Sequence, residues 1–272
     1  MLQAYSSRDE RIRVFTEENK GAGAARNRGL TEATGKYMLF LDCDDFFEPN
    51  MVQLAYEKAE EQRAEIVIYK SDQYNMDSGE FVYENWTMIE WALPPYEPFG
   101  YRQISTNIFK AFVGWAWDKL YLREFVVKND LKFQEQRTTN DALFVFSALV
   151  LAEKISTVRK ILIHRRVDTV DSLSKTREKS WDNFYRMLLA LRQFLKDREK
   201  WNELEKDFVN YALHFSLWNY NTLAEPAKTK LRNKLVSEWF EELGIRQRHK
   251  EYFYNEYEYS QYEAMLKLQD TP

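Results

Sequence analysis

The sequence predicts an α/β fold with a mostly parallel central sheet, followed by an α-helical C-terminal subdomain. Over residues 11–70, strand-like apolar runs alternate with helix-like stretches. The run Tyr37–Leu41 is continuously apolar, as in a strand that is covered on both faces of a parallel sheet. After about Lys175 the composition changes to long charged and aromatic segments with apolar stripes at helical spacing. We therefore expect a sheet domain over residues 1–175 and a helical subdomain over residues 176–272.

The first elements can be placed along the chain by their patterns. Ile12 and Val14 alternate with charged neighbours, which predicts a short strand. The stretch KGAGAARNRGLTEATGKY provides a glycine-rich turn, good helix formers, and Gly35 as a helix stop. The apolar run Tyr37–Leu41 then predicts the next strand. The local order is strand, helix, strand.

A second helix and a further strand continue the alternation. Pro49 can occupy the first turn of a helix whose apolar positions Met51, Leu54 and Ala55 share one face. The segment EIVIYK predicts another buried strand. Later, TTNDALFVFSALVLAEK predicts a helix with Asp141 in its first turn. The carboxylates that follow the Tyr37–Leu41 run are thus expected at the C-terminal end of a central strand, where open α/β sheets bind ligands.

Composition limits the function classes. The chain has 272 residues with 44% hydrophobic content, enough for a sizeable core. Its formal net charge of −4 gives no general basic field, so nucleic acid is not an expected partner. Cys43 is the only cysteine, and the N-terminus has no apolar signal core, which together predict a cytoplasmic protein. The longest apolar run, residues 142–152, is too short to span a bilayer, which leaves peripheral contact with the inner face of a membrane open.

Three carboxylates follow the apolar run in the segment FLDCDD. In a strand, Asp42 and Asp44 would point to one side and Asp45 to the other. Two converging carboxylates suit Mg²⁺ or Mn²⁺, which take one or two protein carboxylates and leave the other positions to water and phosphate oxygens. The alternative is a solvated acidic turn without a ligand. The buried strand in front of the carboxylates favours a site for a divalent cation and a diphosphate.

The segment NKGAGAARNRGLTEATGKYMLFLDCDD resembles the part of family 2 glycosyltransferases in which a glycine-rich turn and an ARNxGL helix precede a strand that ends in a DxD motif. The later segments WDKLYLREFV, NDALF and HRRVDTVDSLS resemble further landmarks of that family in the right order. Together these segments span most of residues 11–174. The resemblance implies a nucleotide-diphospho-sugar transferase fold of the A type.

The resemblance also implies roles for residues at the donor site. Asp42 and Asp44 match the residues that engage the divalent metal and the donor's diphosphate or sugar. Arg26 can add a guanidinium to the same region, unless it is a solvated helix residue. A nucleotide-diphospho-sugar, with a UDP-sugar as the expected donor, and a glycan or glycoconjugate acceptor are the implied partners. Transfer in cell-surface polysaccharide or glycoconjugate synthesis is the implied function.

Asp141 matches the acid that deprotonates the acceptor hydroxyl in inverting members of the family. Capping of the following helix would explain the same residue equally well. The family usually has Glu-Asp here, whereas this chain has Asn140 before Asp141. This departure bears on acceptor positioning and on activity.

Four further residues are candidates for the site. His164 can be a third metal ligand, although a histidine at the end of an apolar strand is more often structural. Arg165, or alternatively its neighbour Arg166, can bind phosphate with two parallel hydrogen bonds. Trp117 offers a flat face for sugar C–H groups, and Asp118 offers an acceptor for sugar hydroxyls, although large aromatic residues are more often part of the core.

Two motifs of the family are not found before Arg11. These are a Pro-x-Tyr-Asn-like turn and an Asp-Asp-Gly-Ser-like turn, which bind the base and ribose. A sheet without the strands that carry them would expose an edge, and such edges pair with other chains. The sequence therefore predicts an N-terminally incomplete sheet, self-association through its edge, and weak or no activity of this chain alone.

Two alternatives remain open. Asn140 favours a degenerate transferase domain that acts as a binding or scaffolding module. The segment FLDCDD also resembles the Asp-x-Asp motif of haloacid-dehalogenase-like phosphatases. That family requires a small hydroxyl residue two positions after the second aspartate, where this chain has Phe46.

Overall fold

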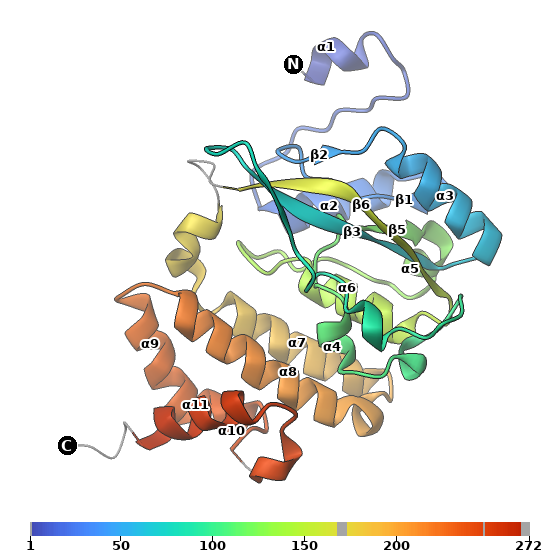
Figure 1. Cartoon of the computed structure of the whole chain (residues 1–272). Coiled ribbons are helices and arrows are strands. Elements are labelled where there is room, and N and C mark those ends of the chain that lie inside the picture. Colours follow the sequence, from blue (N-terminus) through green and yellow to red (C-terminus); the bar gives the residue numbers. More distant parts are fainter. Residues whose placement is uncertain (1, 168–172, 247, 268–272) are drawn as a thin grey trace.

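Six strands form one sheet in the computed structural model, which describes residues 2–167, 173–246 and 248–267 (Figure 1). The strands are β1 (Tyr37–Met38), β2 (Phe46–Phe47), β3 (Ile66–Asn75), β4 (Phe81–Tyr83), β5 (Lys119–Leu122) and β6 (Ile155–Val167). Their order is β1-β5-β3-β6-β2, and β4 pairs with β3. The α/β class is confirmed. The sheet is mixed, because β3 and β6 pair in parallel while the other described pairs are antiparallel.

Strand β3 is buried on both faces, as its apolar run predicts. Ile66 and Ile68 point into one hydrophobic cluster, and Val67 and Tyr69 point into another. Helix α3 (Met51–Gln62) covers the second face, and α6 (Ala142–Leu151) lies on the first. The expected helices after Pro49 and after Asn140 are thus confirmed.

Further helices build the rest of the chain. They are α1 (Leu2–Ser6), α2 (Ala22–Glu32), α4 (Ile108–Ala111), α5 (Arg123–Lys128), α7 (Asn183–Asp197), α8 (Trp201–Thr222), α9 (Ala227–Lys234), α10 (Phe240–Glu242) and α11 (Glu256–Lys267). Short 3₁₀ turns lie at Glu90–Ala92, Tyr101–Gln103, Leu173–Ser180 and Lys250–Tyr252, and a π-helical turn at Leu235–Trp239. None of the described helices combines the length and apolar character that crossing a membrane requires.

The C-terminal helices form a layer below the sheet (Figure 1). Helix α6 lies between the sheet and the pair α7 and α8, and α9 to α11 pack at the far side. Phe146 of α6, Leu188 of α7 and Phe208 of α8 belong to one hydrophobic core that also contains Ile66 of the sheet. The helical character of the C-terminal part is confirmed, and its division from the sheet domain at residue 175 stays a prediction.

The predicted strand at Ile12–Val14 is wrong. This segment pairs with no described strand, and Figure 1 shows the N-terminal segment leading up to α2 outside the sheet. The Ile12 backbone N–H donates to Asp9 O at 3.0 Å, and the side chains of Ile12 and Phe15 are 38% and 43% exposed. Alternation alone does not make a strand without a neighbouring strand to pair with.

The run Tyr37–Leu41 forms a shorter strand than predicted, at an edge of the sheet rather than its centre. Only β1, Tyr37–Met38, is paired, and its described partner is β5. Because β1 and β2 lie at opposite edges, the segment 39–45 crosses the sheet past β5, β3 and β6. The helix before it ends at Glu32, where the N–H of Ala33 donates to Gly29 O, and not at Gly35. This crossing brings the three aspartates next to the edge strand β2.

Candidate active site

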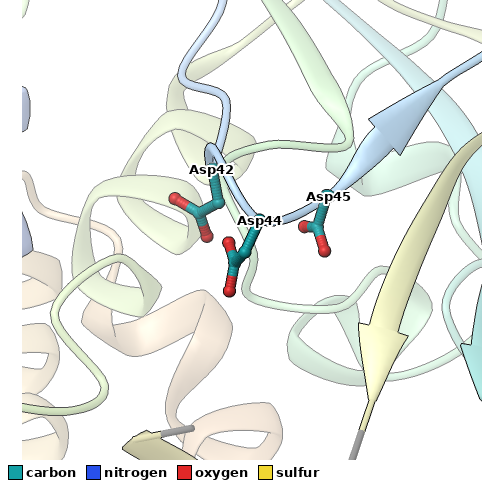
Figure 2. A group of neighbouring side chains, drawn as sticks. All are labelled: Asp42, Asp44 and Asp45. Carbon is teal, nitrogen blue, oxygen red and sulfur yellow. The ribbon is translucent and has the colours of Figure 1, made fainter. Parts of the chain in front are cut away.

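The aspartates lie in a turn directly before β2. Asp42, Asp44 and Asp45 each place a carboxylate oxygen within 4.8 Å of the others. Figure 2 shows Asp42 and Asp44 side by side, with Asp45 next to β2. The predicted divergence of Asp45 is wrong because these residues form a turn, in which side chains do not alternate as in a strand. The turn therefore gathers three carboxylates rather than two.

The environment of Asp45 shows how closely the charges are packed. Its Oδ1 accepts a hydrogen bond from the Arg166 backbone N–H at 3.0 Å. Burial, and then the charges of Asp44 and Asp42, raise the pKa of Asp45 to about 6, although this hydrogen bond and Arg165 oppose the shift. A divalent cation would relieve the repulsion, and carboxylate oxygens are the ligands that Mg²⁺ and Mn²⁺ prefer. The residues present therefore fit such a cation.

His164 is not brought into this cluster. Its Nδ1 lies 2.7 Å from Asp72 Oδ1 and its Nε2 lies 3.1 Å from Glu48 Oε1. Its ring stacks on Phe46, with centroids 4.8 Å apart. Since both ring nitrogens already have carboxylate partners, the structure favours the structural alternative over metal ligation. Residues 168–172 of the HRRVDTVDSLS landmark lie outside the described residues.

Arg26 ties the aspartate turn to the start of α6. Its Nη2 donates to Asp42 Oδ1 at 2.6 Å and its Nη1 donates to Asn140 Oδ1 at 2.7 Å. The Arg26 side chain is only 13% exposed, so these charge-assisted bonds are partly shielded from water. Arg26 therefore lies beside the aspartate turn rather than on a solvated helix face, and Asn140, at the position of the family's usual glutamate, is its second partner.

The glycine-rich start of α2 explains how Arg26 is placed. A Cβ atom on Gly23 would lie 2.0 Å from the backbone oxygen of Gln134, so only glycine permits this approach of α2 to the loop before α6. Asn27 fixes the same contact, because its side chain donates to Phe133 O at 3.0 Å and accepts from Phe133 N at 2.8 Å. Asn27 was missed by sequence reasoning; its place in the ARNxGL motif was the available signal.

Asp141 stands at the N-cap position of α6, where its carboxylate makes no capping hydrogen bond to a described residue. It is half-buried and lines the same cleft as the aspartate turn. Burial raises the pKa of Asp141, while the nearby charge of Arg26 opposes the rise. The carboxylate is therefore available to a ligand, which favours the general-base interpretation over capping.

The structure contradicts the predicted acceptor role of Asp118, whereas that of Trp117 stays a prediction. Asp118 has no exposed surface and lies 2.5 Å from the Lys119 ammonium, so its carboxylate cannot contact a sugar. Lys119 also donates to Val113 O and Trp115 O, which fixes the loop before β5. Trp117 is 4% exposed and lines the cleft, stacked on Trp115 with centroids 4.7 Å apart. Asp118 is thus a structural residue that supports the tryptophan pair.

Arg165 also reaches the cleft. Its guanidinium lies 5.0 Å from the ring centroid of Trp115, and its Nη2 is 3.4 Å from Glu84 Oε1. A guanidinium stacked on an indole is held in place while its edge can still donate. Arg165 therefore stays a candidate for phosphate binding.

One cleft of about 1830 Å³ connects these groups. Its lining includes Arg26, Asp42, Asp44, Asp141 and Arg165, together with residues of the C-terminal helices. Sequence reasoning named the donor end and missed the contribution of the helical part. An acidic turn beside an edge strand of an α/β sheet, two guanidinium groups and a half-buried carboxylate in one cleft form the arrangement expected of an A-type glycosyltransferase site.

Comparison with known proteins agrees with this class. A sequence model of the family described as "Glycosyl transferase family 2" matches residues 1–126. This match covers less than half of the chain, so the similarity to the family applies to residues 1–126.

The chain is similar to the cholesterol galactosyltransferase of Borreliella burgdorferi, with 24% identity over 100% of this chain and 77% of that protein. It is also similar to glycosyltransferase GlyA of Streptococcus pneumoniae, with 29% identity over 66% of this chain and 26% of that protein. Its fold is similar to the crystal structure of S. aureus TarS 1–349 in complex with UDP-GlcNAc, with a TM-score of 0.52, 17% identity, and coverage of 96% and 79% of the two chains. The last comparison establishes the fold alone.

Proposed function

We propose that this chain transfers a sugar from a nucleotide-diphospho-sugar to a hydroxyl group of a glycan or glycoconjugate acceptor. The observation that carries the proposal is the single cleft that joins the aspartate turn to Asp141. A UDP-sugar is the proposed donor, and the UDP-GlcNAc in the TarS structure supports that class. The context proposed is the synthesis of a cell-surface polysaccharide or glycoconjugate.

A divalent cation, Mn²⁺ or Mg²⁺, would be held by Asp42 and Asp44, with Asp45 beside them. When bound, such an ion neutralises negative charge that gathers on a departing nucleotide diphosphate. Arg26 and Arg165, which line the cleft, are the proposed N–H donors to phosphate oxygens of the donor. Arg26 brings a guanidinium that is already oriented by Asp42 and Asn140, so little side-chain entropy is lost on binding.

Asp141 is the proposed general base. In the transfer step, the acceptor oxygen forms a bond to the anomeric carbon, the bond from that carbon to the diphosphate oxygen breaks, and the acceptor proton moves to the Asp141 carboxylate. Attack on the face opposite the diphosphate inverts the anomeric centre. The raised pKa of Asp141 suits this role, since a more basic carboxylate accepts a proton more readily.

The proposed place of the reaction is the cytoplasm, at the inner face of the membrane. The presence of a single cysteine supports a reducing compartment. The formal net charge of −4 argues against a nucleic-acid partner. Peripheral membrane association and self-association through a sheet edge are parts of the same proposal. The short edge strands β1 and β2 are the surfaces through which a second chain would pair.

Release of UDP from UDP-GlcNAc, UDP-glucose and UDP-galactose tests the proposal. With Mn²⁺ present, the chain should release UDP from at least one donor, faster when mixed oligosaccharide acceptors are added. Asp44→Asn and Asp141→Asn should each abolish most of this release while Glu61→Gln, a change on the outer surface of α3, should leave it intact. Metal-dependent UDP binding without release from any donor would favour the scaffolding alternative instead.

A further inference from the structure

The cleft continues from the donor end along the C-terminal helices. Its volume of about 1830 Å³ exceeds the roughly 300–1,000 Å³ that a small-molecule site occupies. One face of α8 lines the additional space, through Asp207, Tyr211, His214, Phe215, Trp218 and Asn219. At a rise of about 1.5 Å per residue, this stripe is roughly 18 Å long. A ligand larger than the donor sugar can therefore lie along it.

An aromatic stack runs along this face and ends at a guanidinium. The rings of Tyr211 and Phe215 stack with centroids 5.5 Å apart, and those of Phe215 and Trp218 with centroids 5.7 Å apart. The Arg177 guanidinium lies 4.2 Å from the centroid of the Trp218 ring. Trp218 is still 44% exposed, so the end of the stack is open to a ligand.

The Arg177 guanidinium is anchored through one nitrogen. Its Nη2 donates to Asn219 Oδ1 at 3.2 Å and to Thr222 Oγ1 at 2.9 Å. Its Nη1 and Nε make no hydrogen bond to any described residue. Burial lowers the pKa of Arg177, and the negative charge of the neighbouring Glu178 opposes this shift. The Glu178 carboxylate itself accepts a hydrogen bond from the Ala224 backbone N–H at 3.4 Å. A fixed guanidinium with two donating nitrogens that bind no described residue is suited to phosphate or carboxylate.

Other cations that line the cleft are paired with acids. Arg26 pairs with Asp42, Lys110 with Glu258, and Arg165 with Glu84. Arg137 and Arg177 differ, because within the described ranges their hydrogen bonds go to neutral oxygens, that of Arg137 to Thr176 Oγ1 at 2.8 Å. Among the described residues, the cleft therefore holds two positive charges without an ion pair, beside the aromatic stack.

These two arginines are distinct from those at the donor end. Arg165 and Arg26 lie near the carboxylates of the donor end. The charge of Arg165 lowers the pKa of Asp45, and the charge of Arg26 lowers the pKa of Asp141. Arg137 and Arg177 instead meet at the 3₁₀ turn Leu173–Ser180, on the side of the cleft formed with α8. Their ligand is accordingly expected on the acceptor side of Asp141.

We propose that Arg137 and Arg177 bind an anionic group of the acceptor, a phosphate or a carboxylate, while sugar rings of that acceptor lie along the Tyr211–Phe215–Trp218 stack. The acceptor is therefore an anionic glycan rather than a neutral one. This inference rests on the proposed transferase function, since it assigns the second substrate of the same cleft. Aromatic faces bind sugar C–H groups, and arginine forks match planar anions.

Calorimetric titration with three probes tests the inference on the full chain. The probes are a glycerol-phosphate tetramer, a hyaluronan tetrasaccharide, which carries carboxylates, and neutral chitotetraose; UDP with Mn²⁺ is titrated separately. At least one anionic probe should bind about tenfold or more tightly than chitotetraose, which corresponds to one charge-assisted hydrogen bond. The two anionic probes distinguish phosphate from carboxylate as the recognised group.

The variants locate the binding. Arg177→Gln should weaken the anionic probe about tenfold and leave UDP binding unchanged, and Trp218→Ala should weaken all oligosaccharide probes. Arg186→Gln is the matched control, because Arg186 is an exposed arginine of α7 paired with Asp182. Equal binding of neutral and anionic probes, no binding of either anionic probe, or loss of UDP binding in Arg177→Gln would each overturn the inference. If UDP fails to bind while anionic probes still depend on Arg177, the proposed function fails and the anion site stands.

Discussion

Replacing Lys119 by methionine is expected to destabilise the protein by about 3–5 kcal/mol. The Lys119 side chain has no exposed surface, and its ammonium donates to Val113 O at 3.0 Å, Trp115 O at 2.8 Å and Asp118 Oδ1 at 2.5 Å. Methionine retains most of the volume, so the loss comes chiefly from the buried Asp118 carboxylate, whose other oxygen already has no partner in the described part of the chain. At an m-value of about 3 kcal/mol/M, the urea midpoint should fall by roughly 1–2 M.

The pH dependence gives this prediction a sharper test. Burial raises the pKa of Asp118 from 3.8 to about 6, against the lowering influence of Lys119. Without Lys119 the pKa of Asp118 should rise further. A carboxyl whose folded pKa lies above its unfolded pKa loses stabilisation as the pH rises through the folded value. The variant should therefore lose more stability at pH 8 than at pH 5.

The double variant Asp118→Asn with Lys119→Met is the control, because it removes both charges and should recover part of the loss. Urea unfolding followed by circular dichroism at the two pH values measures all three proteins. An unchanged midpoint in Lys119→Met, or an equal loss at pH 5 and pH 8, would refute the reasoning that this pair is buried and coupled.

Three further predictions concern the site and the helix that supports it. Asp141→Asn should lower transfer about 10²–10⁴-fold while the UDP dissociation constant stays within about twofold, as measured by UDP release and calorimetry; loss of UDP binding would contradict the role of base. Mn²⁺ affinity should fall as the pH is lowered from 7 to 5, because a proton competes at Asp45, whose pKa is about 6, and Asp45→Asn should flatten this profile; a pH-independent wild-type affinity would exclude Asp45 from the cation site. Gly23→Ala should lower stability by about 1–3 kcal/mol, since its Cβ would lie 2.0 Å from Gln134 O, whereas Gly29→Ala in the same helix has nothing within 4 Å of its Cβ and should stabilise by about 0.5–1 kcal/mol; equal urea midpoints would contradict the close packing of α2.

Much of the fold could be predicted from periodicity. The segment EIVIYK forms β3, and the apolar stripes of the C-terminal part form α7 and α8, because burial on one or both faces leaves a repeating pattern in the sequence. The edge position of β1 could not be predicted in this way. An apolar run records that side chains such as Phe40 are buried, but not whether they are buried by strands or by helices and loops.

The same distinction between local patterns and packing separates the site residues that could be predicted from those that could not. Arg26, Asp42, Asp44 and Asp141 lie in one cleft, as the motifs indicate, since their spacing is tied to local turns and helix starts. Asp118 could not be assigned correctly, because its exposure depends on how β5 packs against its neighbours.

His164 and the arginine pair depend on contacts across the chain. The partners of His164, Asp72 and Glu48, lie on other segments, so its sequence position does not reveal them. Arg177 and Trp218 likewise meet only when the 3₁₀ turn Leu173–Ser180 packs against α8. Residues that act through long-range contacts leave no local pattern to be read.

The most direct test of the central claim is calorimetric titration of the chain with UDP-sugars, with and without Mn²⁺, beside the Asp44→Asn variant. The account predicts binding that requires Mn²⁺ and is lost in the variant, with the far-UV circular dichroism of both proteins unchanged. Binding that is equally strong without Mn²⁺ or in Asp44→Asn, or no binding by the folded wild-type chain, would contradict the claim that the aspartate turn holds a cation and the donor's diphosphate.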